Sequence, residues 1–206
     1  MVITKIEKQK KSKKRWSIFL DDEFACGVYE DTLLKFGLRT NDEVSDKIIN
    51  EIKDFDEYIF AKKTAYDFLS YRIRSIAEIK NRLKAKKVSS STIEKVIEHL
   101  QNLGFINDEE FAKELIQSNI GSKPSGKRVI KQKLFRKGIP ASVSDKVLDE
   151  MFNEINEKEI ALKLYRKYLP KLKNLDKIRK RKKMFDHLIR KGFNMDTVIE
   201  IINEKI

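Results

Sequence analysis

Side chains that commonly catalyse reactions or bind metals are scarce in this sequence. Its 206 residues include two histidines, His99 and His187, and one cysteine, Cys26. Neither histidine has a cysteine or carboxylate neighbour at the spacing of a metal site. Cys26 alternates with apolar residues and has no evident partner base, so we predict a small buried side chain and not a nucleophile. His187 aligns with basic residues of matching segments and is expected to be exposed or at an interface.

Two short motifs could in principle bind ions. The run Asp21-Asp22-Glu23 could hold a hard metal ion, but a hairpin turn between two strands explains it better. The loop Gly121–Lys127 resembles a phosphate-binding loop but lacks the pattern G-x-x-x-x-G-K-S/T, because Arg128 follows the lysine. We therefore expect no metal, no cofactor and no enzymatic activity.

The chemistry that this sequence does offer is electrostatic. Its net charge is +13, although residues 21–57 carry 12 acidic and only 4 basic side chains. Segment 115–144 has 7 basic and no acidic residues, and segment 171–183 has 8 basic residues against the single acidic Asp176. Such clusters suit phosphate contacts, which give affinity without sequence information. No interleaved aromatic residues indicate stacking on bases.

These basic side chains are the candidate contacts with DNA phosphates or with an acidic protein. On a helix, Lys127 and Lys131, and Lys123 with them, would share one face while Ile130 and Leu134 point to the core. The alternatives are a solvated face without a partner and an anionic membrane, which no Trp/Phe-rich apolar face supports. The candidate contacts are Arg72, Arg74, Lys123, Lys127, Arg128, Lys131, Arg136, Lys137, Lys171, Lys173, Arg179, Lys180, Arg181, Lys182 and Lys183.

Alternating apolar residues predict a small β-meander at the N-terminus. The alternation runs through residues 2–6, 16–20 and 24–28. We expect Asp21 and Asp22 to form the tight turn between the last two strands, and Lys8–Lys14 to form a basic turn between the first two. Gly37 is expected to end a short helix over Tyr29–Phe36.

From Asp56 onward the sequence predicts helices that repeat with a period of 49–54 residues. Asp56, Asn107 and Asn156 each stand at an expected helix start, and a glutamate follows each asparagine at the spacing of a capping box. Gly138 and Gly192 are expected left-handed helix caps, whereas Lys87 departs from this pattern. The matched apolar pairs of the second helices are Ile79 and Leu83, Ile130 and Leu134, and Met184 and Leu188.

These patterns predict a mainly α fold. An N-terminal extension over 1–55, with short strands and one or two helices, would precede three-helix units over 56–106, 107–155 and 156–206 in an elongated curved stack. An ordinary helical bundle is the alternative, and residues 79–96 have about the length of a helix-turn-helix. The single cysteine, the lack of a secretory signal and the lack of a long apolar run predict a cytoplasmic protein. The lack of a heptad seam predicts a monomer.

The matched positions resemble the RecX family of regulatory proteins. The stretch Leu103–Ala112 is similar to the family pattern L-G-apolar-apolar-polar-D-x-x-F-A. The resemblance covers about residues 61–206 and is strongest over 72–139. Its other carriers are Arg74-Ser75, Glu78, Leu83, Gly126, Leu134 and Lys137-Gly138-Ile139.

The resemblance implies tandem three-helix repeats and a protein without catalytic residues. It further implies binding to the RecA recombinase filament on single- or double-stranded DNA, without sequence preference. The expected effect is modulation, usually inhibition, of the recombinase, ATPase and coprotease activities of RecA in DNA repair and the SOS response. Two alternatives stay open: a helical DNA-binding protein that acts without RecA, such as a transcriptional regulator, and a protein-interaction scaffold.

Overall fold

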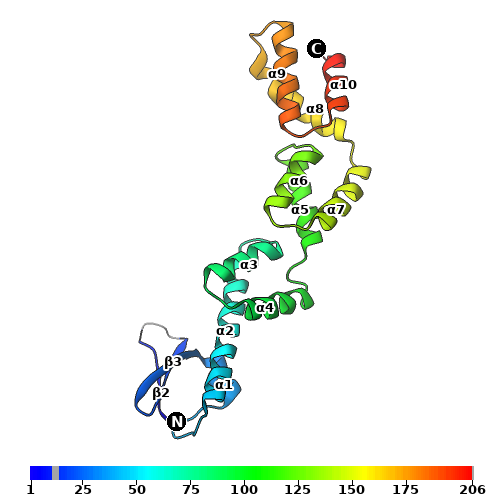
Figure 1. The fold of residues 1–206 in the computed structure, drawn as a ribbon. Helices are drawn as coiled ribbons and strands as arrows, with labels where there is room; N and C mark the ends of the chain where they lie inside the picture. Colours follow the sequence, from blue (N-terminus) through cyan, green and yellow to red (C-terminus); the bar gives the residue numbers. More distant parts are fainter. Residues whose placement is uncertain (11–13, 206) are drawn as a thin grey trace. The chain divides into compact units, whose positions relative to one another are not determined.

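The computed structural model describes residues 1–10 and 14–205 (Figure 1). The described residues form three β-strands, ten α-helices and one short 3-10 helix. They belong to two compact units. The first consists of Met1–Ile73 with Ile79–Phe105, and the second of Arg74–Glu78 with Ile106–Ile206. The fold is therefore mainly α with a small N-terminal sheet, as the sequence predicts.

The N-terminal strands form one antiparallel sheet. Strands β1 (Ile3–Lys8), β2 (Arg15–Leu20) and β3 (Glu23–Tyr29) are paired in sequence order. Asp21 and Asp22 connect β2 to β3 with φ of 48° and 67°, the left-handed backbone that a two-residue hairpin turn requires. The predicted tight turn is thus confirmed. The basic turn predicted over Lys8–Lys14 includes residues 11–13, which lie outside the described residues.

The next helices correct one expected helix start. Helix α1 (Glu30–Phe36) ends at Gly37, whose φ is 60°, as predicted. Helix α2 (Asp46–Leu69) begins after Ser45, whose side chain accepts from the Ile48 N–H. The start expected at Asp56 is therefore wrong, because Asp56 lies in the middle of α2. Helix α2 also crosses the boundary expected between residues 55 and 56. The limits of the N-terminal extension and of the three units remain predictions.

Asp56 does not cap a helix but accepts hydrogen bonds from three residues of the N-terminal region. Its side chain is 8% exposed. One carboxylate oxygen accepts from the Tyr29 N–H (2.6 Å) and the Thr32 hydroxyl (2.9 Å), and the other accepts from Arg15 (2.9 Å). Buried charges are tolerated only when such partners replace water. Asp56 therefore ties α2 to the sheet and to α1.

The remaining helices of the first unit are α3 and α4. Helix α3 spans Ile76–Ala85, and its residues from Ile79 onward belong to this unit. Helix α4 (Ser90–Asn102) starts at the N-cap Ser89 and packs against α2. A separate apolar cluster lies under the sheet and includes Ile3, Ile18 and Ile52.

The second unit contains two groups of three helices (Figure 1). The first group is α5 (Asp108–Gly121), α6 (Lys127–Arg136) and α7 (Ala141–Glu154). The second group is α8 (Glu157–Tyr168), which continues into the 3-10 helix η1 (Leu169–Leu172), α9 (Lys177–Arg190) and α10 (Met195–Lys205). The predicted N-caps Asn107 and Asn156 are confirmed, because each side chain accepts from backbone N–H groups of the first turn.

The second helices of all three repeats carry the predicted core pairs. Leu83, Leu134 and Leu188 are each fully buried. The helix ends are equally alike, since Lys87, Gly138 and Gly192 have φ of 62°, 73° and 86°. In each repeat the next N–H donates back to the carbonyl of that leucine, at 3.1–3.4 Å. This is the bond of a Schellman motif, and Lys87 adopts it although it is not a glycine. The remaining core pair members are Ile79, Ile130 and Met184.

A set of hydrogen bonds ties the N-terminus of α3 to the second repeat. The Ile76 N–H donates to Asp108 Oδ1 (2.9 Å), and Ser75 Oγ donates to the Lys137 carbonyl (2.6 Å). The free N–H groups of a helix start need such acceptors. Asp108, the first residue of α5, thus supplies an acceptor for the start of α3. Ser75, which precedes α3, contacts the end of α6.

The equivalent bonds recur at the N-terminus of α6. The Lys127 N–H donates to Glu157 Oε1 (3.4 Å), and the Gly126 N–H donates to the Lys191 carbonyl (2.9 Å). Glu157 is the first residue of α8, and Lys191 follows the end of α9. The contacts between consecutive segments therefore repeat along the chain, as the helices themselves do.

These recurring contacts give two cap glycines a second purpose. A Cβ on Gly138 would lie 2.3 Å from the Cβ of Ala77, and a Cβ on Gly192 would lie 2.6 Å from the backbone nitrogen of Val129. Neither separation is possible without movement of the backbone. Lys87 is exposed, and its Cβ is therefore accommodated.

Candidate interface for DNA and a protein partner

The basic residues of the second unit lie in distinct places. Lys127, Arg128 and Lys131 of α6 line a groove of about 590 Å³ together with Phe193 and Met195. Lys127 pairs with Asp149 and Lys131 with Asp145, both from α7; the side chains in these pairs are about half exposed. Such exposed pairs contribute little stability, so an incoming phosphate can replace the carboxylate.

Arg128 is fixed in a different way. Its guanidinium donates to the Ile189 carbonyl (2.8 Å), near the end of α9. A cation at the carbonyl end of a helix is favourable because the last carbonyl groups lack partners within the helix. Arg128 thus helps to hold α6 against α9, and it still lines the groove.

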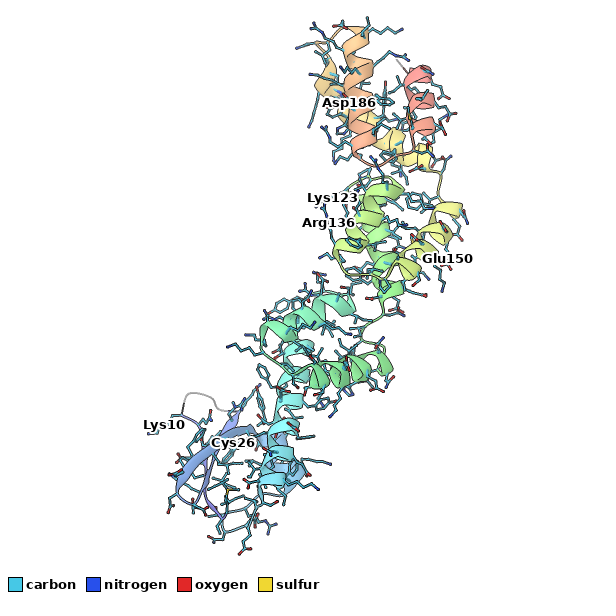
Figure 2. All side chains as sticks on the ribbon, in the orientation of Figure 1. Lys10, Cys26, Lys123, Arg136, Glu150 and Asp186 are labelled. Atoms are coloured by element: carbon cyan, nitrogen blue, oxygen red, sulfur yellow. The ribbon has the colours of Figure 1, made fainter. Side chains whose placement is uncertain are left out.

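Lys123 does not share a face with Lys127 and Lys131, contrary to expectation. Helix α6 begins at Lys127 after its N-cap Gly126, so the spacing of four residues does not continue the helix back to position 123. Lys123 instead belongs to the preceding loop and lines a second cavity. Figure 2 shows Lys123 and Arg136 on one flank of the second repeat and Glu150 on the other.

This second cavity, the lysine pocket, has a volume of about 400 Å³. Five lysines line it and no carboxylate does. Its walls come from the loop before α6 and from α6, α8, η1 and α9. The lining residues are Ser122, Lys123, Pro124, Ser125, Lys133, Leu164, Lys167, Tyr168, Lys171, His187 and Lys191.

The residues that the structure describes place no acid in the lining of this pocket. Lys133 donates to the neutral side-chain oxygen of Asn119. Burial lowers the pKa of Lys133, and the neighbouring charges of Lys191 and Lys123 lower it further. The lysine pocket is therefore a region of strong positive potential.

His187 forms part of one wall of the lysine pocket. Its ring stacks on Tyr168 with a centroid separation of 3.7 Å and an interplanar angle of 3°. Its Nδ1 is buried and has no hydrogen-bond partner among the described residues. Burial, Lys191, Arg190 and Lys171 lower the pKa of His187, in that order of importance. The ring is thus half-buried between helices α8 and α9.

The basic run of η1 and α9 is largely exposed. Arg179 pairs with Asp176 at 3.3 Å, and Arg181 donates to Asn203 Oδ1 at 2.5 Å. Lys182 and Lys183 are exposed, and so is Lys173, while Lys180 is half-buried.

The other expected contacts are partly used inside the protein. The Lys137 ammonium lies 2.7 Å from Glu78 Oε1, which fixes the N-terminal turn of α3 against the end of α6. Arg72 donates to the Ile73 carbonyl (2.8 Å) and is exposed, whereas Arg74 is half-buried. Of these residues, Arg72 is the most accessible to an external anion.

Two exposed apolar side chains stand beside basic ones. Phe135 is 79% exposed next to Arg136, and Ile178 is 80% exposed next to Arg179. Exposed aromatic and aliphatic side chains rimmed by charge are typical of protein interfaces. Neither residue is recognisable from the sequence, because apolar spacing alone does not distinguish an exposed position from a core one.

Sequence reasoning also missed several residues of the lysine pocket. Lys133, Lys167 and Lys191 were not among the candidate contacts. One signal was present: Lys167 and Lys171, and likewise His187 and Lys191, are four residues apart. On a continuous α-helix that spacing puts two residues on one side. Lys171 lies in η1 and Lys191 follows the end of α9, however, so only the fold brings these side chains to one cavity.

The described residues offer neither a metal site nor a membrane-spanning helix. No group of three or more His, Cys, Asp or Glu side chains is arranged to hold a metal ion. Within residues 1–10 and 14–205, helices of the length and apolarity needed to cross a bilayer do not occur.

Tandem three-helix repeats with basic, partly apolar outer surfaces define a class of helical repeat proteins, and comparisons with known proteins specify the family. Models of the "Regulatory protein RecX N-terminal domain" and of the first, second and third RecX three-helix domains match residues 1–45, 61–100, 107–148 and 156–202. The chain belongs to the RecX family of regulatory proteins.

Individual relatives agree with this assignment. "Regulatory protein RecX" of Clostridioides difficile strain 630 is 31% identical over 98% of this chain and 95% of its own length. The protein of the same name from Staphylococcus aureus strain Newman is 31% identical over 98% of this chain and 74% of its own length.

Solved structures show the same fold. A crystal structure of regulatory protein RecX superposes with a TM-score of 0.75 and 31% identity, covering 99% of both chains. A crystal structure of RecX from Lactobacillus salivarius gives a TM-score of 0.65 and 26% identity, covering 72% of this chain and 96% of that one.

Proposed function

We propose that this protein binds RecA on DNA and lowers the recombinase, ATPase and coprotease activities of the filament. The observation that carries the proposal is the match of all four RecX domains, in order, along the chain. The regulatory role in the names of its relatives supports it further. The protein would act without catalysis and without a cofactor, as a monomer in the cytoplasm.

The groove of α6 and the basic run of α9 are the proposed contacts. Lysine and arginine there would approach DNA phosphates or acidic RecA surfaces, and this attraction would speed encounter. Phe135 and Ile178 would then bury apolar area against RecA and slow dissociation. Single- and double-stranded DNA are both suitable, because phosphate contacts carry no sequence information.

The direct test is a titration of the full-length protein into RecA assembled on single-stranded DNA. ATP hydrolysis is followed, with matched reactions that lack DNA. We expect DNA-dependent hydrolysis to fall when the protein is well below the RecA concentration, because a few bound molecules can block filament growth or promote disassembly. Unchanged hydrolysis, together with binding to naked DNA, would favour a DNA-binding protein that acts without RecA.

A further inference from the structure

The lysine pocket requires a separate explanation, because the fold brings like charges together there. Lys123, Lys133, Lys167, Lys171 and Lys191 come from five different segments of the second unit. Like charges around one cavity repel each other, and this repulsion destabilises the folded protein unless an anion compensates it.

Other lysines of the same unit provide an internal comparison. Lys127, Lys131, Lys146 and Lys158 each lie within 3 Å of at least one carboxylate oxygen. These four lysines are thus neutralised by acids of the same unit. In the lysine pocket, by contrast, Lys133 donates to a neutral amide oxygen. The site is therefore already arranged for a negative group from outside the chain.

The size and the charge of the lysine pocket specify the ligand. A volume of about 400 Å³ exceeds that of one phosphate group, and five ammonium groups match several negative charges. Lysine ammonium groups act as mobile point charges, which suits phosphate chains of variable geometry. Leu164 and the stacked pair of Tyr168 and His187 add an apolar wall for a sugar or base.

We propose that the lysine pocket binds two or more linked phosphate groups. The source is either successive phosphodiesters of a nucleic-acid strand or the phosphate chain of a free nucleotide. The nucleic-acid source rests on the proposed function and deepens it. The free-nucleotide source stands independently of any action on RecA.

The test uses the full-length protein and two probes. Inorganic tripolyphosphate is titrated by calorimetry, and a fluorescent oligodeoxythymidylate is titrated by anisotropy. The test variant combines Lys133→Gln with Lys191→Gln. The matched control combines Lys113→Gln on α5 with Lys163→Gln on α8, both exposed, outside the lysine pocket and outside the basic run of α9. We expect the test variant to bind tripolyphosphate at least tenfold more weakly, and the control to stay within about twofold of wild type.

A footprint on the wild-type protein guards against misfolding of the variant. Lysines are acetylated with and without tripolyphosphate, and their modification is compared by mass spectrometry. The pocket lysines should be protected and Lys163 should not. Equal protection everywhere, or equal weakening by test and control variants, would overturn the proposal.

Competition separates the two sources. If the oligodeoxythymidylate displaces tripolyphosphate, the lysine pocket takes strand phosphates. If tripolyphosphate binds and the oligonucleotide does not compete, the pocket takes a free phosphate chain. Both results support the lysine pocket. If the protein had no effect on ATP hydrolysis by RecA, the proposed function would be contradicted. The proposal of a phosphate site in the lysine pocket would not be affected.

Discussion

At the scale of single residues, Asp56 shows how a buried carboxylate organises the N-terminal region. It accepts from a backbone N–H, a hydroxyl and a guanidinium of residues at least 24 positions away in sequence. Removing the acceptor takes one hydrogen bond from each of these groups, although the Arg15 guanidinium also donates to the Gly27 carbonyl. A buried donor that loses its acceptor costs more than the bond itself contributes. The position was misread as a helix start because aspartate is common at N-caps and the distant donors leave no trace in local sequence.

We therefore expect Asp56→Ala to destabilise the protein by about 2–4 kcal/mol, since it removes the carboxylate partner of the partly buried Arg15. Unfolding in urea, followed by circular dichroism, measures the change. Asp54→Ala on the exposed face of the same helix is the matched control and should shift stability by less than about 0.5 kcal/mol. Equal effects of both substitutions would show that the buried contacts contribute nothing specific.

At the scale of secondary structure elements, the helix ends were predicted correctly from residues close to them in sequence. Asn107, Asn156, Gly37, Gly138 and Gly192 were predicted as helix limits and are confirmed, because caps depend on a few neighbouring residues. The length of α2 and the lysine pocket were not predicted. Both depend on contacts between segments that are far apart in the chain, and a pattern within one segment does not contain that information.

Two glycines with the same backbone conformation should respond differently to substitution. Gly138→Ala adds the cost of a left-handed alanine and a clash with Ala77, together roughly 2 kcal/mol or more. Gly104→Ala meets no atom within 4 Å at a φ of 70°, so we expect only about 1 kcal/mol. Chemical denaturation of both variants compares them directly. Similar losses would mean that α3 and the end of α6 separate readily in solution.

At the scale of the whole molecule, charge is divided unevenly along the chain. Residues 21–57 are acidic on balance, whereas the basic segments 115–144 and 171–183 both belong to the second unit. A polyanion should therefore be attracted mainly to the second unit. This predicts that the location of a charge matters more than the net charge of the protein.

Two double variants with the same change in net charge test this. Lys182→Glu with Lys183→Glu alters the exposed basic run of α9, and Lys84→Glu with Lys86→Glu alters exposed lysines of the first unit. We expect the α9 variant to need about tenfold more protein to inhibit RecA hydrolysis, which corresponds to about 1.4 kcal/mol. It should also show a shallower dependence on salt, whereas the other variant should resemble wild type. Equal loss in both would indicate a general effect of net charge.

The contrast between Lys87 and the two cap glycines has a consequence for building longer arrays. The start of α3 packs against Gly138, and the start of α6 packs against Gly192. Both contacts are so close that they leave no space for a Cβ. A designer who inserts an additional repeat ahead of α3 should therefore also introduce Lys87→Gly. The inserted helix could then pack against position 87 as closely as α3 packs against Gly138. A glycine at this helix cap would then indicate, from the sequence alone, that a preceding repeat packs closely against it. The number of such glycines would give the number of repeats joined by this contact.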